Sequence, residues 1–370
     1  MGARPSLKTV AAAAGVSVSS VSNAYNRPGQ LSDEVRERIF RVAAEQGYGG
    51  PDTAARTLRG KRAGAIGVLV TEGLTYAFTD PYTTRMLAGF AEIAEKSQTA
   101  ITVIPIASTQ GRDRDADVVK QSALAVQQAV VDGIMIYCVD TDHPARDVLR
   151  RRDLPIVTDF DLGEPDHGMV LIDEAAAAEP AGAHIRELGH RRIAVLMDTP
   201  STPGAGPEIV PSDRVAGQFN MLELQRMSGL ARGLGPDMQI TTIASGGNSD
   251  ALGYAAANLA LSLDPRPTAI LAISDVQAIA AMRAIRDRGL VPGRDVSVTG
   301  FDDIPEAAAA GLTTVHQPIR ERGQILGRML LDPEFTARRV VLPTKLVVRM
   351  STGPAPTSSA PEPARRVSSA

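Results

Sequence analysis

Hydrophobic and polar residues follow two different patterns along the 370-residue chain. In the first sixty residues, three short helical patterns are separated by turn residues. They are Leu7 to Ala14, a segment that Ser17 caps and that runs to about Tyr25, and a segment that begins after Ser32 and stops at Gly47. Two short helices joined by a turn of three or four residues that contains glycine match the spacing of a helix-turn-helix.

From residue 63 the pattern changes to short apolar strands that alternate with amphipathic helices. The predicted strands cover 65–70, 100–106, 133–139, 156–159, 170–172, 193–197, 239–243, 269–272 and 296–299. The predicted helices cover 84–96, 118–130, 174–188, 212–227, 250–262, 276–289 and 319–330. This order indicates parallel sheets that are covered by helices and joined by right-handed crossovers, and the length fits two such lobes better than one.

Two segments lack this alternation. Residues 199–211 are rich in proline and glycine and predict a long loop. Residues 351–370 are mostly Ser, Pro and Ala without apolar periodicity, so we expect a disordered tail. Because the tail has no heptad pattern, it gives no support for a C-terminal tetramer zipper.

The composition restricts the class of protein. The apolar runs are far shorter than the roughly 20 residues that a membrane-spanning helix needs, and the N-terminus lacks the apolar run of a secretory signal. We therefore expect a cytoplasmic protein without a membrane partner. The single cysteine, Cys138, excludes an internal disulfide framework and a cysteine metal cluster, and its neighbours predict a buried strand residue. The sequence predicts no cofactor, no metal site and no catalytic residue.

The net charge of -3 is the sum of two unequal parts. Residues 1–62 hold ten basic and five acidic residues and carry +5, whereas the remaining residues hold 29 basic and 37 acidic residues and carry -8. Such an asymmetry indicates a basic module for an anionic partner, joined to a neutral or acidic body.

A series of sequence blocks then carries a family resemblance. The blocks are LKTVAAAAGVSVSSVSN at 7–23, QGY at 46–48, AARTLRG at 54–60, IGV at 66–68, ELGHRRIA at 187–194, SD at 274–275, DVSVTGFDD at 295–303 and LTTVHQP at 312–318. In this order they resemble the lactose-repressor (LacI/GalR) family of bacterial transcription regulators. The resemblance implies an N-terminal all-α helix-turn-helix head and an α/β core that resembles periplasmic binding proteins, with two doubly wound parallel-sheet lobes.

The resemblance also implies how the chain is divided and what it binds. It places the DNA-binding head in 1–50, a hinge helix and linker in 51–62, a two-lobed core for effector binding and dimerisation in 63–350, and the tail in 351–370. The implied partners are pseudo-palindromic double-stranded operator DNA, a small sugar or nucleoside effector, and a second copy of the chain in a homodimer.

The second helix of the head would then lie in the major groove. By resemblance, Val18, Ser19 and Asn23 occupy base-reading positions. The residues expected to contact phosphates or brace the head are Ser17, Ser20, Ser22, Asn26 and Tyr48. The family commonly has Arg where this chain has Asn23, and Asn pairs with adenine rather than guanine or makes a looser contact. The alternative is that Asn23 only caps or solvates the helix.

The hinge resemblance covers residues 54–58. Leu58 takes the family's wedge position, where an apolar side chain between base steps costs a few kcal/mol of unstacking and bends the duplex. Ala55 and Arg59 belong to the same predicted contact set. The basic side chains around the wedge would neutralise phosphates or form a solvated linker, and they are Arg56, Arg59, Lys61 and Arg62.

For the effector, the resemblance favours positions at the carboxyl ends of the core strands. The best-supported positions are Arg214, Ser274, Asp302 and Gln317, with Asp275 close by. Further candidates are Tyr76, Phe78 and Asp80 after the first core strand, and Phe160 and Phe301, of which Phe301 either lines the pocket or packs. Ser274 departs from the Asn often found there. Sugars, sugar phosphates and nucleosides are the candidate ligands, and an uncharged one is favoured because no strong Lys and Arg cluster is evident.

A ligand-binding protein or an enzyme of carbohydrate metabolism is the alternative class. The chain has five His residues, but it has no glycine-rich phosphate loop, no metal-spaced His pair and no nucleophile elbow. A pure ligand-binding module leaves the helix-turn-helix pattern and the basic hinge unexplained. The sequence therefore predicts a DNA-binding regulator, a repressor by family habit, and not an enzyme.

Overall fold

A computed structural model of the protein describes residues 6–26, 28–48, 63–70, 73–106, 123–137, 143–198 and 206–356. The chain divides into two compact units, one of residues 1–66 with 130–132 and one of residues 67–129 with 133–370. Within the described ranges, no helix is long and apolar enough to cross a membrane. The predicted hinge residues and Cys138 lie outside the described residues.

Three helices form the head: α1 (Leu7–Ala14), α2 (Val18–Asn26) and α3 (Asp33–Glu45), with a 3-10 turn at Pro28–Gln30. Their inward faces form one apolar core around Val10, Val21 and Ile39, each fully buried. The predicted boundaries are confirmed: Gly15 ends α1 in the left-handed conformation, with φ 64°, and Ser17 accepts a hydrogen bond from the backbone N–H of Ser20 at 3.0 Å.

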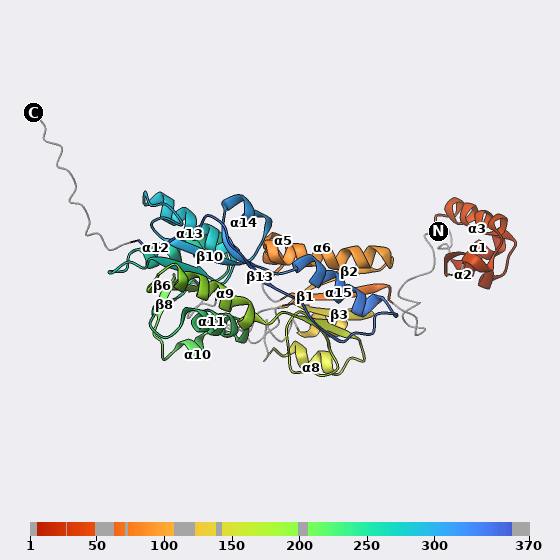
Figure 1. The fold of residues 1–370 in the computed structure, drawn as a ribbon. Coiled ribbons are helices and arrows are strands. Elements are labelled where there is room, and N and C mark those ends of the chain that lie inside the picture. Colours follow the sequence, from red (N-terminus) through yellow and green to blue (C-terminus); the bar gives the residue numbers. More distant parts are fainter. Residues whose placement is uncertain are drawn as a thin grey trace, which may run out of the picture. The chain divides into compact units, whose positions relative to one another are not determined.

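Two sheets form the core, as Figure 1 shows. The first, in the order β12-β5-β4-β3-β1-β2, contains β1 (Ala65–Val70), β2 (Ala100–Pro105), β3 (Gly133–Tyr137), β4 (Ile156–Thr158), β5 (Gly168–Leu171) and β12 (Arg339–Val341). The second, in the order β13-β11-β10-β9-β6-β8-β7, contains β6 (Arg192–Met197), β7 (Glu208–Val210), β8 (Gln239–Ala244), β9 (Ala269–Ala272), β10 (Ser297–Asp302), β11 (Thr313–His316) and β13 (Lys345–Val347).

The ladders confirm the predicted doubly wound lobes. In the first sheet, β12, β5, β4 and β3 pair in parallel. In the second, β8, β6, β9, β10 and β11 pair in parallel, and the edge strands β7 and β13 are antiparallel to their neighbours. The remaining helices of the core are α5 (Gly73–Thr79), α6 (Pro81–Lys96), α8 (Ala145–Arg150), α9 (Glu174–Glu187), α10 (Val215–Gln218), α11 (Met221–Leu234), α12 (Asp250–Leu261), α13 (Asp275–Asp287), α14 (Pro305–Ala310) and α15 (Ile319–Leu331).

The chain passes between the two lobes three times. It leaves the first sheet after β5 and enters the second lobe through α9, which packs against α11. It returns after β11 through α15, which packs against α6, β4 and β5 of the first lobe. The third passage joins β12 to β13. The first residues of α9 and α15 therefore lie at the boundary between the lobes.

Glycines allow both of these crossover helices to pack with their backbones close to a partner helix. A methyl group at Gly229 of α11 would overlap the carbonyl oxygen of Ala175 in α9, and one at Gly182 would overlap that of Leu230. In the first lobe, a methyl group at Gly323 of α15 would overlap the carbonyl oxygen of Met86. Because these glycines have no side chain, α9 and α15 each make close backbone contact with a partner helix of their own lobe.

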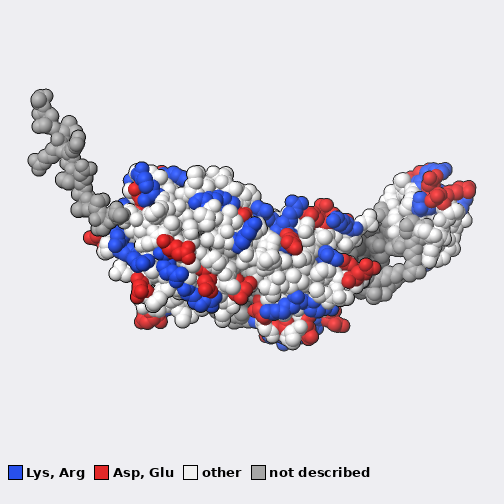
Figure 2. All heavy atoms as spheres, viewed as in Figure 1, with Lys and Arg blue, Asp and Glu red and all other residues white. Residues whose placement is uncertain are grey.

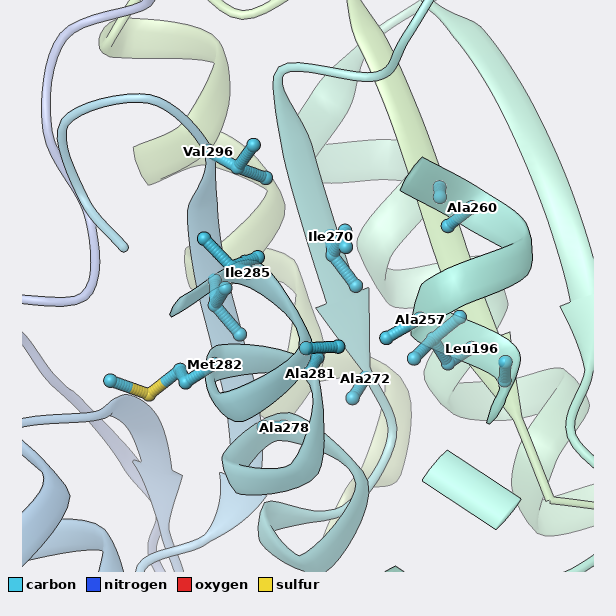
Figure 3. Packing of buried hydrophobic residues seen from close by; sticks show 14 of the residues in the cluster. Leu196, Ala257, Ala260, Ile270, Ala272, Ala278, Ala281, Met282, Ile285 and Val296 are labelled. Atoms are coloured by element: carbon cyan, nitrogen blue, oxygen red, sulfur yellow. The ribbon is translucent and has the colours of Figure 1, made fainter. Parts of the chain in front are cut away.

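Alanine-rich helix faces cover the second sheet (Figure 3). Ala257 and Ala260 of α12 and Ala278 and Ala281 of α13 are fully buried against strand residues such as Ile270. Small side chains on these helix faces let the helices lie close to the larger aliphatic side chains of the sheet.

Two sequence expectations are wrong in the core. The single helix expected over 212–227 is two helices, α10 and α11, because Phe219 is extended and Asn220 begins a new helix with a capping box. The Asn220 side chain accepts from the N–H of Glu223 at 3.0 Å, and its own N–H donates to Glu223 at 3.1 Å. The loop expected over 199–211 contains β7, an edge strand on β8.

The disordered tail that the sequence predicts from residue 351 does not begin there, because the structure describes residues 351–356. Residues 351–356 pack on the second lobe through polar contacts. Packing of this kind needs no periodic apolar residues, so no hydropathy pattern marks the segment in the sequence. The buried Ser351 hydroxyl donates to the carbonyl oxygen of Val298 at 2.6 Å and accepts from the N–H of Thr313 at 2.7 Å. The carbonyl oxygen of Gly353 lies 3.0 Å from Nε2 of His190. Residues 357–370 lie outside the described residues.

The glycine contact between α9 and α11 gives a stability prediction. Gly229→Ala forces the two helices apart, and we expect a loss of about 1–3 kcal/mol in the free energy of unfolding despite the better helix propensity of alanine. The matched control is Gly217→Ala in α10, where an added methyl group meets no atom within 4 Å. Urea unfolding of both variants decides the matter, and equal midpoints for the two would contradict the packing argument.

Candidate functional site

The outward face of α2 is the candidate DNA-reading surface. Val21 and Ala24 point into the head core, and helical periodicity puts Ser19 and Asn23 on the opposite side, whereas Val18, three residues before Val21, lies at the edge between the two faces. The Val18 side chain is 44% exposed, although it is apolar. Ser22 and the backbone of Asn26 lie on the same side of the helix, and the structure does not describe the Asn26 side chain. This face is short, neutral and free of long side chains.

The remaining predicted head residues hold α2 in place. The Ser17 hydroxyl lies 2.7 Å from that of Ser19 and 2.8 Å from that of Ser20, so three hydroxyls form one cluster at the start of the helix. Tyr48 packs edge-on against Tyr25 of α2, with ring centroids 6.1 Å apart. The predicted DNA contacts at Ala55, Leu58 and Arg59 lie outside the described residues.

The described head carries no excess charge. Its basic residues are Lys8, Arg36, Arg38 and Arg41, and its acidic residues are Asp33, Glu34, Glu37 and Glu45. Figure 2 shows both signs together on the head and interspersed on the visible face of the core. The +5 of residues 1–62 therefore belongs to residue 4, residue 27 and residues 52–62, which lie outside the described residues.

In the core, a cluster of buried charged and polar side chains lies where α9 and α15 begin. Arg226 of α11 is its first centre. Its Nε donates to Glu174 at 2.8 Å and its Nη1 donates to the carbonyl oxygen of Ile273 at 2.7 Å. The guanidinium lies 3.8 Å from the ring centroid of Phe301, and Nη1 lies 3.9 Å from Asp302. Phe301 therefore packs against the guanidinium group of Arg226. The four side chains of this group are all buried, and they are Glu174, Arg226, Phe301 and Asp302.

Arg322 of α15 is the second centre. Its Nη1 donates to the hydroxyl of Tyr82 and to Oε1 of Gln317, the latter at 3.3 Å. Gln317 in turn donates to Asp302 at 2.6 Å. Hydrogen bonds thus connect α6 and α15 of the first lobe, through Gln317 two residues before α15, with β10 of the second lobe. Among the described residues, Nε and Nη2 of Arg322 have no hydrogen-bond partner.

Asp302 stands at a strained position at the end of β10. Its φ is 117° and that of Asp303 is 54°, in a region where residues other than glycine are uncommon and cost about 1–3 kcal/mol. Burial raises the pKa of Asp302 well above its ordinary value, although the charge of Arg226 lowers it. Backbone strain of this kind is found most often at functional sites, and perturbed pKa values also gather there.

A second connection joins the lobes through three side chains. Asn248, which follows β8, donates from Nδ2 to the hydroxyl of Tyr76 in α5 at 3.1 Å, and its Oδ1 accepts from the hydroxyl of Ser274 at 2.7 Å. Ser274 also caps α13. The predicted effector residues Tyr76 and Ser274 therefore meet through a residue that the sequence did not single out.

Two predicted effector residues are engaged in structural hydrogen bonds. Asp80 caps α6, accepting from the N–H and the hydroxyl of Thr83 at 2.8 and 2.7 Å. Asp275 is fully buried, accepting from the hydroxyl of Thr314 at 2.5 Å and from the N–H of Ile304 at 2.9 Å. Burial raises the pKa of Asp275 to about 7. These carboxylates position the segments around the cluster.

Three predicted effector residues take no part in the contacts described for the cluster. Phe78 is 60% exposed, Arg214 is exposed at the start of α10, and Phe160 is half-buried after β4. A surface hollow on the second lobe, next to Met282 and Met350, is also separate and shares no residue with the cluster. No group of side chains suited to a metal ion occurs in the described part of the chain.

Sequence reasoning missed Glu174, Arg226 and Arg322. It placed Tyr82 in the aromatic segment 76–82 after the first core strand and Asp159 beside the cleft candidate Phe160, without giving either residue a role of its own. A signal was present for the two arginines, because each occupies the buried face of an amphipathic helix next to a close-packed glycine, Gly229 or Gly323. A charge on such a face has to meet a partner inside the protein.

Comparisons with known proteins agree with this architecture. The family model for bacterial regulatory proteins of the lacI family matches residues 6–50, and that for a periplasmic binding protein-like domain matches residues 183–352. An HTH-type transcriptional regulator of Mycolicibacterium smegmatis is 37% identical over 95% of this chain and 97% of its own length. The chain belongs to the LacI family of bacterial transcriptional regulators.

Solved structures resemble this LacI-family chain over nearly its full length. The lac repressor dimer bound to operator and the anti-inducer ONPF is 25% identical, with a TM-score of 0.71, and covers 95% of this chain and 100% of its own. The CelR–cellobiose complex is 28% identical, with a TM-score of 0.61, and covers 94% of this chain and 100% of its own. The chain is therefore a DNA-binding transcriptional regulator, from a family of regulators and not of enzymes.

The buried ion pair of this regulator gives a test of the site's electrostatics. Arg226→Met leaves the Glu174 carboxylate buried without its cation, and we expect a loss of about 3–5 kcal/mol in the free energy of unfolding. The matched control is Arg232→Met on the same helix, which breaks the half-exposed pair with Glu179 and costs less than about 1 kcal/mol. Urea unfolding gives both values, and similar losses would contradict the role of burial.

Proposed function

We propose that this protein is a repressor that binds a pseudo-palindromic operator as a homodimer, and that a small sugar-like or nucleoside effector bound between its lobes controls operator affinity. The observation that carries this proposal is the polar cluster at the start of both crossover helices. A ligand that binds there contacts both lobes at once and favours one lobe arrangement over another.

The DNA side of the proposal rests on α2. Its outward face presents Val18, Ser19 and Asn23, which suit contacts to a thymine methyl and to adenine in the major groove. The solved lac repressor dimer, which resembles this chain along its length, is bound to operator, and this supports the same arrangement here. A homodimer places two heads on two half-sites.

The effector side of the proposal rests on the side chains that span the lobes. Arg322 with Gln317, and Tyr76 with Asn248, link the two lobes through hydrogen bonds that a ligand can replace or strengthen. The cellobiose complex of CelR supports a sugar-like ligand. Coupling between ligand and operator of about 1–3 kcal/mol corresponds to a change of roughly 5- to 150-fold in operator affinity.

The test has two stages on the full chain. Operator sequences are selected from a random duplex library, and sugars and nucleosides are screened for a rise in melting temperature, which a ligand that binds the native state produces. We expect a two-fold symmetric operator, and we expect hits to change operator affinity in fluorescence anisotropy. Hits that leave operator affinity unchanged would contradict effector control.

Asn23→Arg is the matched variant for the same experiment. We expect the selected operator to change at the base pair that residue 23 reads, because Arg prefers guanine and Asn prefers adenine. The rise in melting temperature with each hit should stay as in the wild type, since residue 23 belongs to the head. Identical preferred operators for the two proteins would show that Asn23 only solvates α2.

A further inference from the structure

We propose that Asp132 is a positioning residue for operator binding, because its carboxylate fixes the direction in which the predicted linker of residues 51–62 leaves the core. Asp132 directly precedes β3 and binds the first two described residues after the linker, Ala63 and Gly64. This inference rests on the proposed function, because it assigns a residue to the proposed operator affinity.

The Asp132 carboxylate binds two consecutive backbone N–H groups. Its Oδ1 accepts from the N–H of Ala63 at 2.6 Å, and its Oδ2 accepts from the N–H of Gly64 at 2.7 Å. The N–H of Asp132 donates to the carbonyl oxygen of Ala65 at 2.8 Å. Hydrogen bonds to an ionised carboxylate are about twice as strong as those between neutral groups. We call these three hydrogen bonds the Asp132 clamp, and they make residues 130–132 part of the same compact unit as residues 1–66.

The backbone conformation of Gly64 makes the double contact possible. Its φ is 74°, in the left-handed region, and such a residue can turn successive N–H groups toward one acceptor. A Cβ atom at this position would meet no atom within 4 Å, so packing does not require a glycine here. The conformation does, because a residue with a side chain is unfavourable in the left-handed region. Gly64 therefore serves the contact with Asp132.

The residue after Asp132 is closely packed in the first lobe. A Cβ atom at Gly133 would lie 3.1 Å from the Leu330 side chain and 3.2 Å from the carbonyl oxygen of Pro155. Leu330 belongs to α15, the crossover helix that carries Arg322 in the polar cluster. This helix of 13 residues is about 20 Å long and thus extends from the polar cluster to the residue beside the Asp132 clamp.

A fixed position for the end of the linker favours the binding of two heads to one operator. Ordering the backbone of a residue is entropically unfavourable, and residues that the free protein already holds add nothing to this cost on binding. Release of Ala63 and Gly64 from Asp132 adds two residues that have to be ordered when the heads bind. Operator affinity therefore depends on Asp132 through the position of the linker, without a contact between Asp132 and DNA.

The sign of the effect separates this role from simple electrostatics. Removal of a carboxylate by itself strengthens binding to a polyanion such as DNA, because one repulsive charge is lost. The Asp132 clamp predicts weaker binding for Asp132→Ala. The matched control is Asp153→Ala, since Asp153 is exposed on the same lobe and has no hydrogen bond or ion pair among the described contacts.

The first arm of the test measures the Asp132 clamp in the DNA-free full chain. The N–H of Ala63 belongs to the Arg62–Ala63 peptide bond, which trypsin can cleave only after this segment opens locally. We expect Asp132→Ala to raise the cleavage rate at this bond at least about 5-fold, because it removes hydrogen bonds to a charged group. Mass spectrometry follows the products, and Asp153→Ala should match the wild type.

The second arm measures affinity for the operator duplex selected with the wild type, by fluorescence anisotropy. Asp132→Ala and Gly64→Ala should each bind about 5- to 30-fold more weakly, the factor that corresponds to ordering the backbone of one residue. A purely structural role would lower the active fraction in a stoichiometric titration and leave the affinity of that fraction unchanged. Gly64→Ala keeps the Asp132 charge, so it remains informative if Asp132→Ala fails to fold.

The inference is overturned by an unchanged cleavage rate in folded Asp132→Ala, by operator affinity that is equal or tighter in both variants, or by an equal loss in Asp153→Ala. The failure of the proposed function looks different. In that case no screened sugar or nucleoside changes the operator affinity of the wild type, whereas trypsin cleavage still reports the Asp132 clamp.

Discussion

Two guanidinium groups are buried where the chain crosses between the lobes, and the rest of the core depends on how their charge is compensated. Arg226 is paired with Glu174, the first residue of α9, and Arg322 bonds to Gln317, just before α15. An uncompensated buried charge costs several kcal/mol, so both crossovers are held at the cluster. Glycine contacts then fix α9 on α11 and α15 on α6. The arrangement of the lobes is consequently coupled to the ion pairs and hydrogen bonds that compensate these two charges.

Positive charge is distributed unevenly within residues 1–62. The described head is neutral and presents a short face of Val, Ser and Asn on α2, so under the proposed function its selectivity would depend on the fit to base edges. The excess positive charge lies on Arg4, Arg27, Arg56, Arg59, Lys61 and Arg62, opposed by Asp52 alone among the undescribed residues of 1–62. Attraction to DNA phosphates, which falls as salt rises, is thus expected from the N-terminus and linker more than from the globular head.

Much of the fold was predictable, because strands such as 65–70 and 269–272 are apolar runs between amphipathic helices, and the caps at Gly15, Ser17 and Ser32 follow local rules. The break at Phe219 was missed because its capping box lies inside a helical pattern. Residues 351–356 were missed because they pack through hydrogen bonds, which leave no hydropathy signal. In the site, the resemblance named Asp302 and Gln317, but Arg226, Arg322 and Asp159 depend on contacts between elements that are distant in sequence.

The central claim is that a small effector bound at this cluster controls operator affinity, as proposed above, and the reciprocity of that coupling tests it most directly. If the effector changes the affinity for operator by some factor, the operator has to change the affinity for the effector by the same factor. Calorimetry of the best hit with the full chain, alone and saturated with its selected operator, should give affinities that differ by roughly 5- to 150-fold. Equal affinities for the free and the operator-bound protein would contradict this coupling.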